Sequence, residues 1–177
     1  MYDKKYIPGR KLVAARALEI ERGIRMSVER IESRQALKYI RNYFRSHDEL
    51  NHKQVIRMIA SESDTPPEVL KAMAQSTTRV DILERIASHP NTPDEVLHRL
   101  ATHAAKEIRL AVASNINAAP IAVNPLVSDE SPTVRFTLAG NHSTEEIILR
   151  ELMDDENPFV SVRAEQTIDR VNRESRL

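Results

Sequence analysis

The chain has 177 residues, of which 41% are hydrophobic and 29% are charged, and its formal net charge is zero, which suits one globular body with a single core. The absence of cysteine excludes disulfides, thiolate chemistry and cysteine-bound zinc or iron–sulfur sites, and it favours a reducing compartment. No apolar run approaches the roughly 18 residues of a membrane span, and the charged start lacks a signal peptide's apolar stretch, so we expect a cytoplasmic protein with no membrane partner.

Residues 1–50 are predicted to form an N-terminal helical cap. Apolar residues recur there at spacings of three and four, which is typical of one face of a helix. The first such stripe consists of Val13, Ala17, Ile20, Ile24, Val28 and Ile31. A second helix is expected from Ser33 to Phe44. Because a terminal unit of a helical stack has no neighbour beyond it, we expect these helices to cover the apolar end of the stack.

Charge is divided unevenly along the chain. Residues 1–46 hold twelve Lys or Arg and five Asp or Glu, so the remainder carries an equal excess of acid. Five of the cations follow helical spacings and would share one face if the helix continues through Ser33. These candidate binding residues are Arg30, Arg34, Lys38, Arg41 and Arg45. Two interpretations stay open: a contact strip for phosphates or an acidic protein surface, or a solvated face opposite the apolar one.

The rest of the chain repeats itself. Three consecutive blocks of 26 residues, at 91–116, 117–142 and 143–168, carry apolar residues in register. The matching sets are Val96, Leu97 and Leu100, then Ala122, Val123 and Leu126, then Ile148, Leu149 and Leu152. The period extends upstream with one extra residue between Ala74 and Ile82, which makes about four and a half units. Such a period predicts a solenoid, in which each unit is stabilised by its neighbours.

Each block carries signals for two short helices. A Ser or Thr followed three residues later by Glu has the spacing of a capping box, in which both side chains bind free backbone N–H groups. The pairs are Thr65 with Glu68, Thr92 with Glu95, and Ser143 with Glu146. Pro66 and Pro93 are expected at the first helical position, as are Pro132 and Pro158 in second helices. Pro125 interrupts an expected helix and predicts a short or kinked element with a local 3₁₀ turn.

The alignment of the second helices leaves one alternative open. Their apolar position shifts by one residue between the early and late units. Either the twist changes near residue 90, or the extra residue lies elsewhere than after Ala74. In the late units Ile108 and Leu110 fall on nearly opposite sides of one helix. A helix that is apolar on two sides is expected in a middle layer.

Two stretches resemble known repeat families. The sequence TPDEVLHRLA at residues 92–101 resembles the leucine-rich repeat variant, a family of short helices within the wider HEAT and armadillo class. The sequence DESPTVR at residues 129–135 is similar to the Asp-x-x-x-x-Val-Arg signature of HEAT repeats, in which Asp and Arg bridge units. The resemblance implies an all-α, right-handed superhelix of about four to five repeats over residues 51–177, acting as a scaffold for protein contacts. The choice between the two families stays open.

Nothing in the sequence points to catalysis, since it has no HExxH, GxSxG or phosphate-binding glycine-rich motif. We expect a non-enzymatic protein without a cofactor. The predicted partner is another protein, held by the repeats or by the basic N-terminal face, with Arg109 and Arg135 as candidate contacts on the repeat surface. The alternative is nucleic acid bound by the N-terminal face, against which stand the absence of Trp and the scarcity of aromatic residues. Opposite charges at the two ends also permit weak self-association.

Overall fold

The computed structural model describes residues 33–47 and 52–174, and every regular element in these ranges is a helix. The predicted all-α class is therefore confirmed. The first helix of the predicted cap, with the stripe from Val13 to Ile31, lies outside the described residues, as does Arg30. The elements are α2 (Arg34–Ser46), α3 (His52–Ile59), α4 (Pro67–Ser76), α5 (Val80–Ser88), α6 (Asp94–Ala101), α7 (Lys106–Ser114), α8 (Pro120–Val123), the 3₁₀ helix η1 (Asn124–Leu126), α9 (Pro132–Gly140), α10 (Glu146–Met153) and α11 (Pro158–Glu174).

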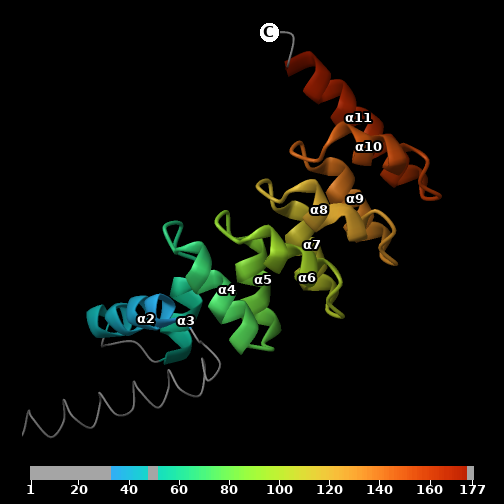
Figure 1. The fold of residues 1–177 in the computed structure, drawn as a ribbon. Helices are drawn as coiled ribbons and strands as arrows, with labels where there is room; N and C mark the ends of the chain where they lie inside the picture. Colours follow the sequence, from blue (N-terminus) through green and yellow to red (C-terminus); the bar gives the residue numbers. More distant parts are fainter. Residues whose placement is uncertain (1–32, 48–51, 175–177) are drawn as a thin grey trace, which may run out of the picture.

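The helices follow one another in chain order along an elongated body, from α2 near one end to α11 at the other (Figure 1). One layer is formed by α3, α5, α7, α9 and α11, each of which packs against the next, and we call it the odd-helix layer. Other helices pair with this layer, because α4 contacts α5, α6 contacts α7, and α10 contacts α11. The helices therefore pack both within each pair and against the neighbouring pairs.

The apolar residues that recur with the repeat form the core between these helices. All nine residues of the three matching sets are at most 4% exposed, and they lie in α6, in α8 with η1, and in α10. In the odd-helix layer the corresponding buried residues are Ile82, Ile108, Val134 and Val160, and one turn later Ile86, Val112, Leu138 and Ala164. The spacing of four within each helix places both sets on one face. Leu110, on the second apolar side of α7, is half-buried against the same core.

The predicted capping boxes are wrong. Helix α6 begins at Asp94 with Pro93 as its N-cap, so Thr92 lies outside the helix and its side chain makes no cap bond. In the same way α4 begins after Pro66, and α10 begins at Glu146 after Glu145. Because each helix starts later than predicted, none of the three predicted pairs occupies the capping-box positions. These pairs are Thr65 with Glu68, Thr92 with Glu95, and Ser143 with Glu146. The helices start later because the residue before each one has an extended backbone.

The threonines of these loops close the turn between two helices instead. The buried hydroxyl of Thr92 donates to the carbonyl oxygen of Ile86, in the last turn of α5. Thr144, rather than Ser143, makes the corresponding bond in the later unit, donating to the carbonyl oxygen of Leu138 at 3.0 Å. A buried hydroxyl with a partner satisfies a free carbonyl group at the end of a helix.

Proline marks the expected positions in the second helices. Pro132 and Pro158 are the first residues of α9 and α11, as predicted. Pro125 also behaves as predicted, because α8 ends at Val123 and the chain continues as the 3₁₀ helix η1. A proline at the start of a helix costs no hydrogen bond, whereas one inside a helix removes a donor and shortens the element.

Buried asparagines join neighbouring units after α7 and after α9. The side-chain amide of Asn115 donates to the carbonyl oxygens of Ala87 at 2.8 Å and His89 at 3.1 Å. The amide of Asn141 repeats the pattern, donating to Ala113 at 3.0 Å and Asn115 at 3.2 Å. The donors lie 26 to 28 residues from their acceptors, so each bond spans one repeat. Both amides are buried and hydrogen-bonded, as buried polar groups require.

Candidate interaction surfaces

The basic face predicted near the N-terminus begins later than expected. Ser33 is the N-cap of α2, with φ −71° and ψ 113°, and its hydroxyl oxygen accepts a bond from the backbone N–H of Ala36. Helix α2 therefore does not continue through Ser33, which was the condition for a five-residue stripe, and Arg30 lies outside the described residues. The four remaining cations are exposed and form no ion pair with another described residue. They are Arg34, Lys38, Arg41 and Arg45, and we call them the α2 basic face.

Contacts on the opposite side of α2 hold this face outward. Ala36 and Ile40 are fully buried, and α2 packs against α3 and α4. The hydroxyl of Tyr43 donates to the carboxylate of Glu62 at 3.0 Å. Burial, and next the bond to Glu62, raise the pKa of Tyr43 to about 12. The α2 basic face is thus a fixed, solvated array of four charges.

Arg109 and Arg135 do not lie on the repeat surface, so that expectation is wrong. They are 6% and 7% exposed, and each makes a double hydrogen bond to a carboxylate whose side chain is also buried. Arg109 binds Asp129 at 2.7 and 3.1 Å, and Arg135 binds Asp155 at 2.7 and 3.0 Å. Each carboxylate lies in the loop before the next odd-numbered helix, so each pair bridges two units. The bond from Arg135 holds the pKa of Asp155 below its ordinary value.

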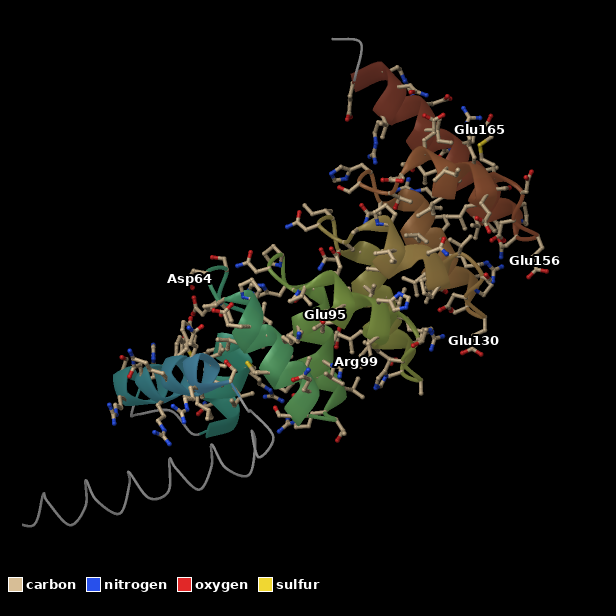
Figure 2. All side chains as sticks on the ribbon, in the orientation of Figure 1. Asp64, Glu95, Arg99, Glu130, Glu156 and Glu165 are labelled. Carbon is tan, nitrogen blue, oxygen red and sulfur yellow. The ribbon has the colours of Figure 1, made fainter. Side chains whose placement is uncertain are left out.

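Exposed acids surround these bridges. Glu130 and Glu156 extend from the loops before α9 and α11 (Figure 2). They accept further bonds from Arg109 at 3.0 Å and Arg135 at 3.3 Å. Because one carboxylate of each set is buried and the other is solvated, the solvent-facing side of each bridge is negative. At the loops before α9 and α11, the exposed side chains of these bridges are therefore Glu130 and Glu156, and the arginines are buried.

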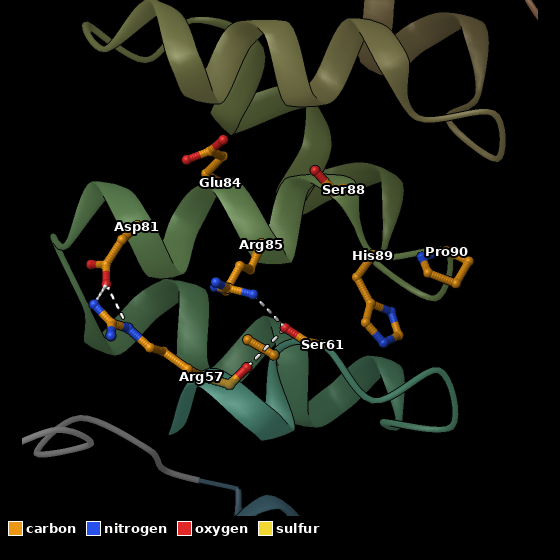
Figure 3. A pocket seen from close by; sticks show the side chains of 9 residues that line it. Arg57, Ser61, Asp81, Glu84, Arg85, Ser88, His89 and Pro90 are labelled. Atoms are coloured by element: carbon orange, nitrogen blue, oxygen red, sulfur yellow. Dashed lines mark hydrogen bonds and ion pairs between the residues drawn. The ribbon is translucent and has the colours of Figure 1, made fainter. Parts of the chain in front are cut away.

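A first hollow of about 580 Å³ lies between α3 and α5 on the odd-helix layer. Arg57 pairs across it with Asp81 at 2.7 Å, and Arg85 donates to the hydroxyl of Ser61 at 2.9 Å (Figure 3). Hydrogen bonds from Arg79, and then from Arg57, lower the pKa of Asp81 to about 2. The cations that line this hollow are thus engaged with neighbouring side chains of the chain itself.

A second hollow of about 460 Å³ lies between α9 and α11 on the same layer, and its lining is mainly apolar. It is lined by Phe136, Pro158, Phe159, Val162, Arg163 and Gln166. Phe159 is 75% exposed, and Phe136 and Val162 are also exposed. The guanidinium carbon of Arg163 lies 5.7 Å from the centre of the Phe136 ring, which is a cation–π contact. The two ends of the odd-helix layer therefore differ, polar at α3 and α5 and apolar at α9 and α11.

One column of the repeat carries a signal for the second hollow that the apolar spacing alone does not interpret. Glu84 of α5 corresponds to Leu110, Phe136 and Val162 in the later units, so the column changes from charged to apolar. We expected this column to be the second buried side of a middle layer. Leu110 is half-buried, but Phe136 and Val162 are exposed, since no described helix covers them. Only the packing of the odd-helix layer determines which residues of this column are buried and which are exposed.

The described part of the chain offers neither a metal site nor a membrane span. No group of three or more His, Cys, Asp or Glu side chains there is placed to hold a metal ion. None of the described helices is both long enough and apolar enough to cross a bilayer. Three of the described histidines lie against backbone carbonyl oxygens: His98 is 2.9 Å from that of Ile121, His47 is 3.0 Å from that of Tyr43, and His89 contacts that of Glu62.

Comparison with known proteins returned no relative: no family model, no curated protein and no solved structure matches the chain. Its function is therefore inferred from its described surfaces. Two of them present side chains that are free to meet a partner, namely the α2 basic face and the second hollow.

Proposed function

We propose that the protein is a non-enzymatic scaffold that binds another protein, and that its helices form a right-handed solenoid of about four to five repeats of the leucine-rich repeat variant or HEAT-like type. The recurrence of Asn115 with Asn141, and of Arg109 with Arg135, supports the repeat. Repeats of this kind offer an extended surface to a partner. The absence of cysteine favours a reducing compartment, such as the cytoplasm.

The second hollow carries this proposal. Phe159 leaves three quarters of its surface in water, next to the exposed Phe136 and Val162. Isolated apolar side chains are common on protein surfaces, but grouped aromatic ones around a hollow are typical of contact sites. Covering a phenylalanine or valine side chain contributes on the order of 1.5–3 kcal/mol when burial is complete. An apolar partner surface is the chemistry that this hollow accommodates.

Nucleic-acid binding is the second candidate, and the α2 basic face favours it. Four exposed cations on one helical face match a phosphate backbone in charge. If all four contact phosphates, the affinity should fall with salt along a log–log slope of about −3 to −4. Binding in the apolar hollow should change far less with salt. The salt dependence therefore separates the two candidates.

The test is affinity capture of partners from the cells that produce the protein, with and without nuclease treatment. Three tagged chains are compared with the wild type. Phe159→Ser with Val162→Ser alters the second hollow, and Arg34→Glu with Lys38→Glu and Arg41→Glu reverses the α2 basic face. Ile121→Ser is the matched control, because Ile121 is 70% exposed but lies on α8, outside the odd-helix layer.

We expect a nuclease-resistant protein that the wild type and the Ile121 variant retain and the Phe159 variant loses. Loss of all captured material after nuclease treatment, together with loss in the α2 variant, would instead establish nucleic-acid binding. Capture of nothing beyond the chain itself would contradict both candidates. In that case sedimentation at low and high salt reports whether the charged ends bring copies of the chain together.

A further inference from the structure

The second hollow continues into a basic hollow on α11. This neighbouring hollow, of about 450 Å³, is lined by Arg170 and Arg173 with Thr167 and Glu174. Arg163 and Gln166 line both hollows, so the apolar and basic parts form one surface. We define the α11 surface by the residues that carry its chemistry: Phe136, Phe159, Val162, Arg163, Arg170 and Arg173.

The spacing along α11 arranges these residues as a continuous stripe. Phe159, Arg163, Gln166, Arg170 and Arg173 are separated by four, three, four and three residues, so they share one helical face. At about 1.5 Å per residue the stripe is roughly 20 Å long. That length matches about six residues of an extended peptide or about four turns of a helix. The apolar end faces Phe136, and the other end carries the two exposed arginines.

Arg163 lies between these two ends, and its guanidinium group has a hydrogen-bond donor without a partner. Its Nε atom is buried and has no hydrogen-bond partner. Its guanidinium group lies against Gly140, where an added Cβ would stand 2.8 Å from Nε. Arg85 of α5 occupies the corresponding place three repeats earlier, and there the group opposite is Ser61, whose hydroxyl it binds at 2.9 Å. Glycine in place of serine thus leaves Arg163 without the internal partner that Arg85 has.

Charge around the surface selects for a short acidic ligand. Residues 129–174 contain five arginines, no lysine and eleven acidic residues. Arg163, Arg170 and Arg173 form no ion pair with a described residue, whereas the acids Glu165 and Asp169 lie on the adjoining faces of α11. A polyanion would extend beyond the arginines into this acidic region and be repelled. A segment with a few carboxylates meets three arginines and one acid, Glu174, so the net charge that it faces is positive.

We propose that the α11 surface binds an acidic, amphipathic segment of a partner protein. An apolar side chain of the segment covers Phe159 and Val162 beside Phe136. Its carboxylates accept hydrogen bonds from Arg163, Arg170 and Arg173, in the charge-assisted pairing that guanidinium groups favour. This inference rests on the proposed scaffold function and names the chemistry of the partner.

The probe is a displayed library of random peptides of about 12 residues, selected on the full-length protein at low salt. We expect the enriched peptides to carry two or more Asp or Glu close to a Leu, Ile, Phe or Trp. Enrichment of no peptide, or of peptides with no more acid than the starting library, overturns the inference. An enriched peptide is then labelled, and its affinity is measured by fluorescence anisotropy beside a version with Gln and Asn replacing Glu and Asp.

Three variants test the three parts of the surface. Arg170→Glu with Arg173→Glu should weaken the acidic peptide at least about tenfold and leave the amide version nearly unchanged. Phe159→Ser should weaken both versions. Gly140→Ser should give Arg163 a hydroxyl partner and move its flexible guanidinium group, which weakens the acidic peptide several-fold without loss of stability. Urea unfolding of each variant verifies that the free energy of unfolding is not reduced.

The matched controls are Arg34→Glu with Lys38→Glu, which reverses two charges on α2, and Ile121→Ser on α8. Both should bind the acidic peptide as the wild type does. Equal loss in the controls, equal affinity of the two peptide versions, or displacement of the peptide by oligothymidine would overturn the inference. If the α11 variants bind normally while affinity capture still retains a nuclease-resistant protein, the scaffold proposal stands and the acidic segment is excluded.

Discussion

The guanidinium group of Arg109 is fully satisfied by the loop that carries Asp129, together with the loop before its own helix. Its N–H groups make five hydrogen bonds, two to Asp129, one to Glu130, and one each to the carbonyl oxygens of His103 and Ala104. A guanidinium group has five N–H donors, so none remains for a partner. This residue therefore fixes the position of one helix pair on the next.

Loss of this bridge should destabilise the protein rather than weaken its binding. Arg109→Met leaves the carboxylate of Asp129 buried without a counter-charge, which costs about 3–5 kcal/mol of unfolding free energy. Adding Asp129→Asn removes the charge and keeps an acceptor for the N–H of Ser131, so the double variant should regain part of the loss. Urea unfolding measures both.

The control for this bridge is Arg150→Met. Arg150 pairs with Glu146 on the exposed side of α10, and such a pair contributes less than about 1 kcal/mol. Equal effects of Arg109→Met and Arg150→Met would mean that Arg109 is solvated in solution and that the buried bridge does not form.

The asparagine between units is the second structural link to test. Asn141→Asp replaces a donor of two hydrogen bonds by a carboxylate facing the carbonyl oxygens of Ala113 and Asn115. We expect a loss of at least about 2 kcal/mol at neutral pH, because a buried charge replaces satisfied bonds. Asn117→Ala removes one bond at an exposed position and should cost under about 1 kcal/mol. Thermal unfolding at pH 7 compares the two, and an equal loss would contradict the inter-unit role of Asn141.

Two apolar residues of α10 allow the effect of a core substitution to be compared with that of a surface substitution. Leu149 is buried and Ile147 is 73% exposed, although both lie in α10. Leu149→Ala should cost about 2–5 kcal/mol because it leaves a cavity, whereas Ile147→Ala should change stability by about 0.5 kcal/mol or less. Calorimetric unfolding gives both values. If Leu149→Ala does not change the free energy of unfolding, the repeat alignment that places Leu149 in the core is wrong.

Acid should weaken the contact between α3 and α5. The pKa of Asp81 is lowered to about 2 by Arg79 and Arg57, so its ion pairs stabilise the folded protein fully above the ordinary pKa near 3.8. As the pH falls from about 4 towards 2, the folded carboxylate is protonated and this stabilisation is lost. Asp81→Asn lacks the titrating group. The difference in urea midpoint between wild type and variant should therefore shrink between pH 5 and pH 2.5, and a constant difference would contradict the pairing.

The buried face of each repeat was predictable, while the roles of its polar residues were not. Leu100 and Ile108 recur with a spacing that only burial on one side explains, and both are buried. Local sequence rules predict a helix cap at Thr92 and a surface cation at Arg109. Their partners, Ile86 and Asp129, are set by how the chain turns between helices. A polar side chain has several possible partners, and sequence spacing does not choose among them.

The sequence by itself determined the all-helical class, the repeat and the break at Pro125, because periodic apolar residues and prolines act on the backbone within a few residues. Only the tertiary structure decided which apolar column is covered. Leu110, Phe136 and Val162 belong to one column, yet Leu110 is half-buried and the other two are exposed. Likewise Arg85 finds Ser61 where Arg163 meets Gly140. The physical reason is that burial and pairing depend on the neighbouring helix, which lies more than 20 residues away in the chain.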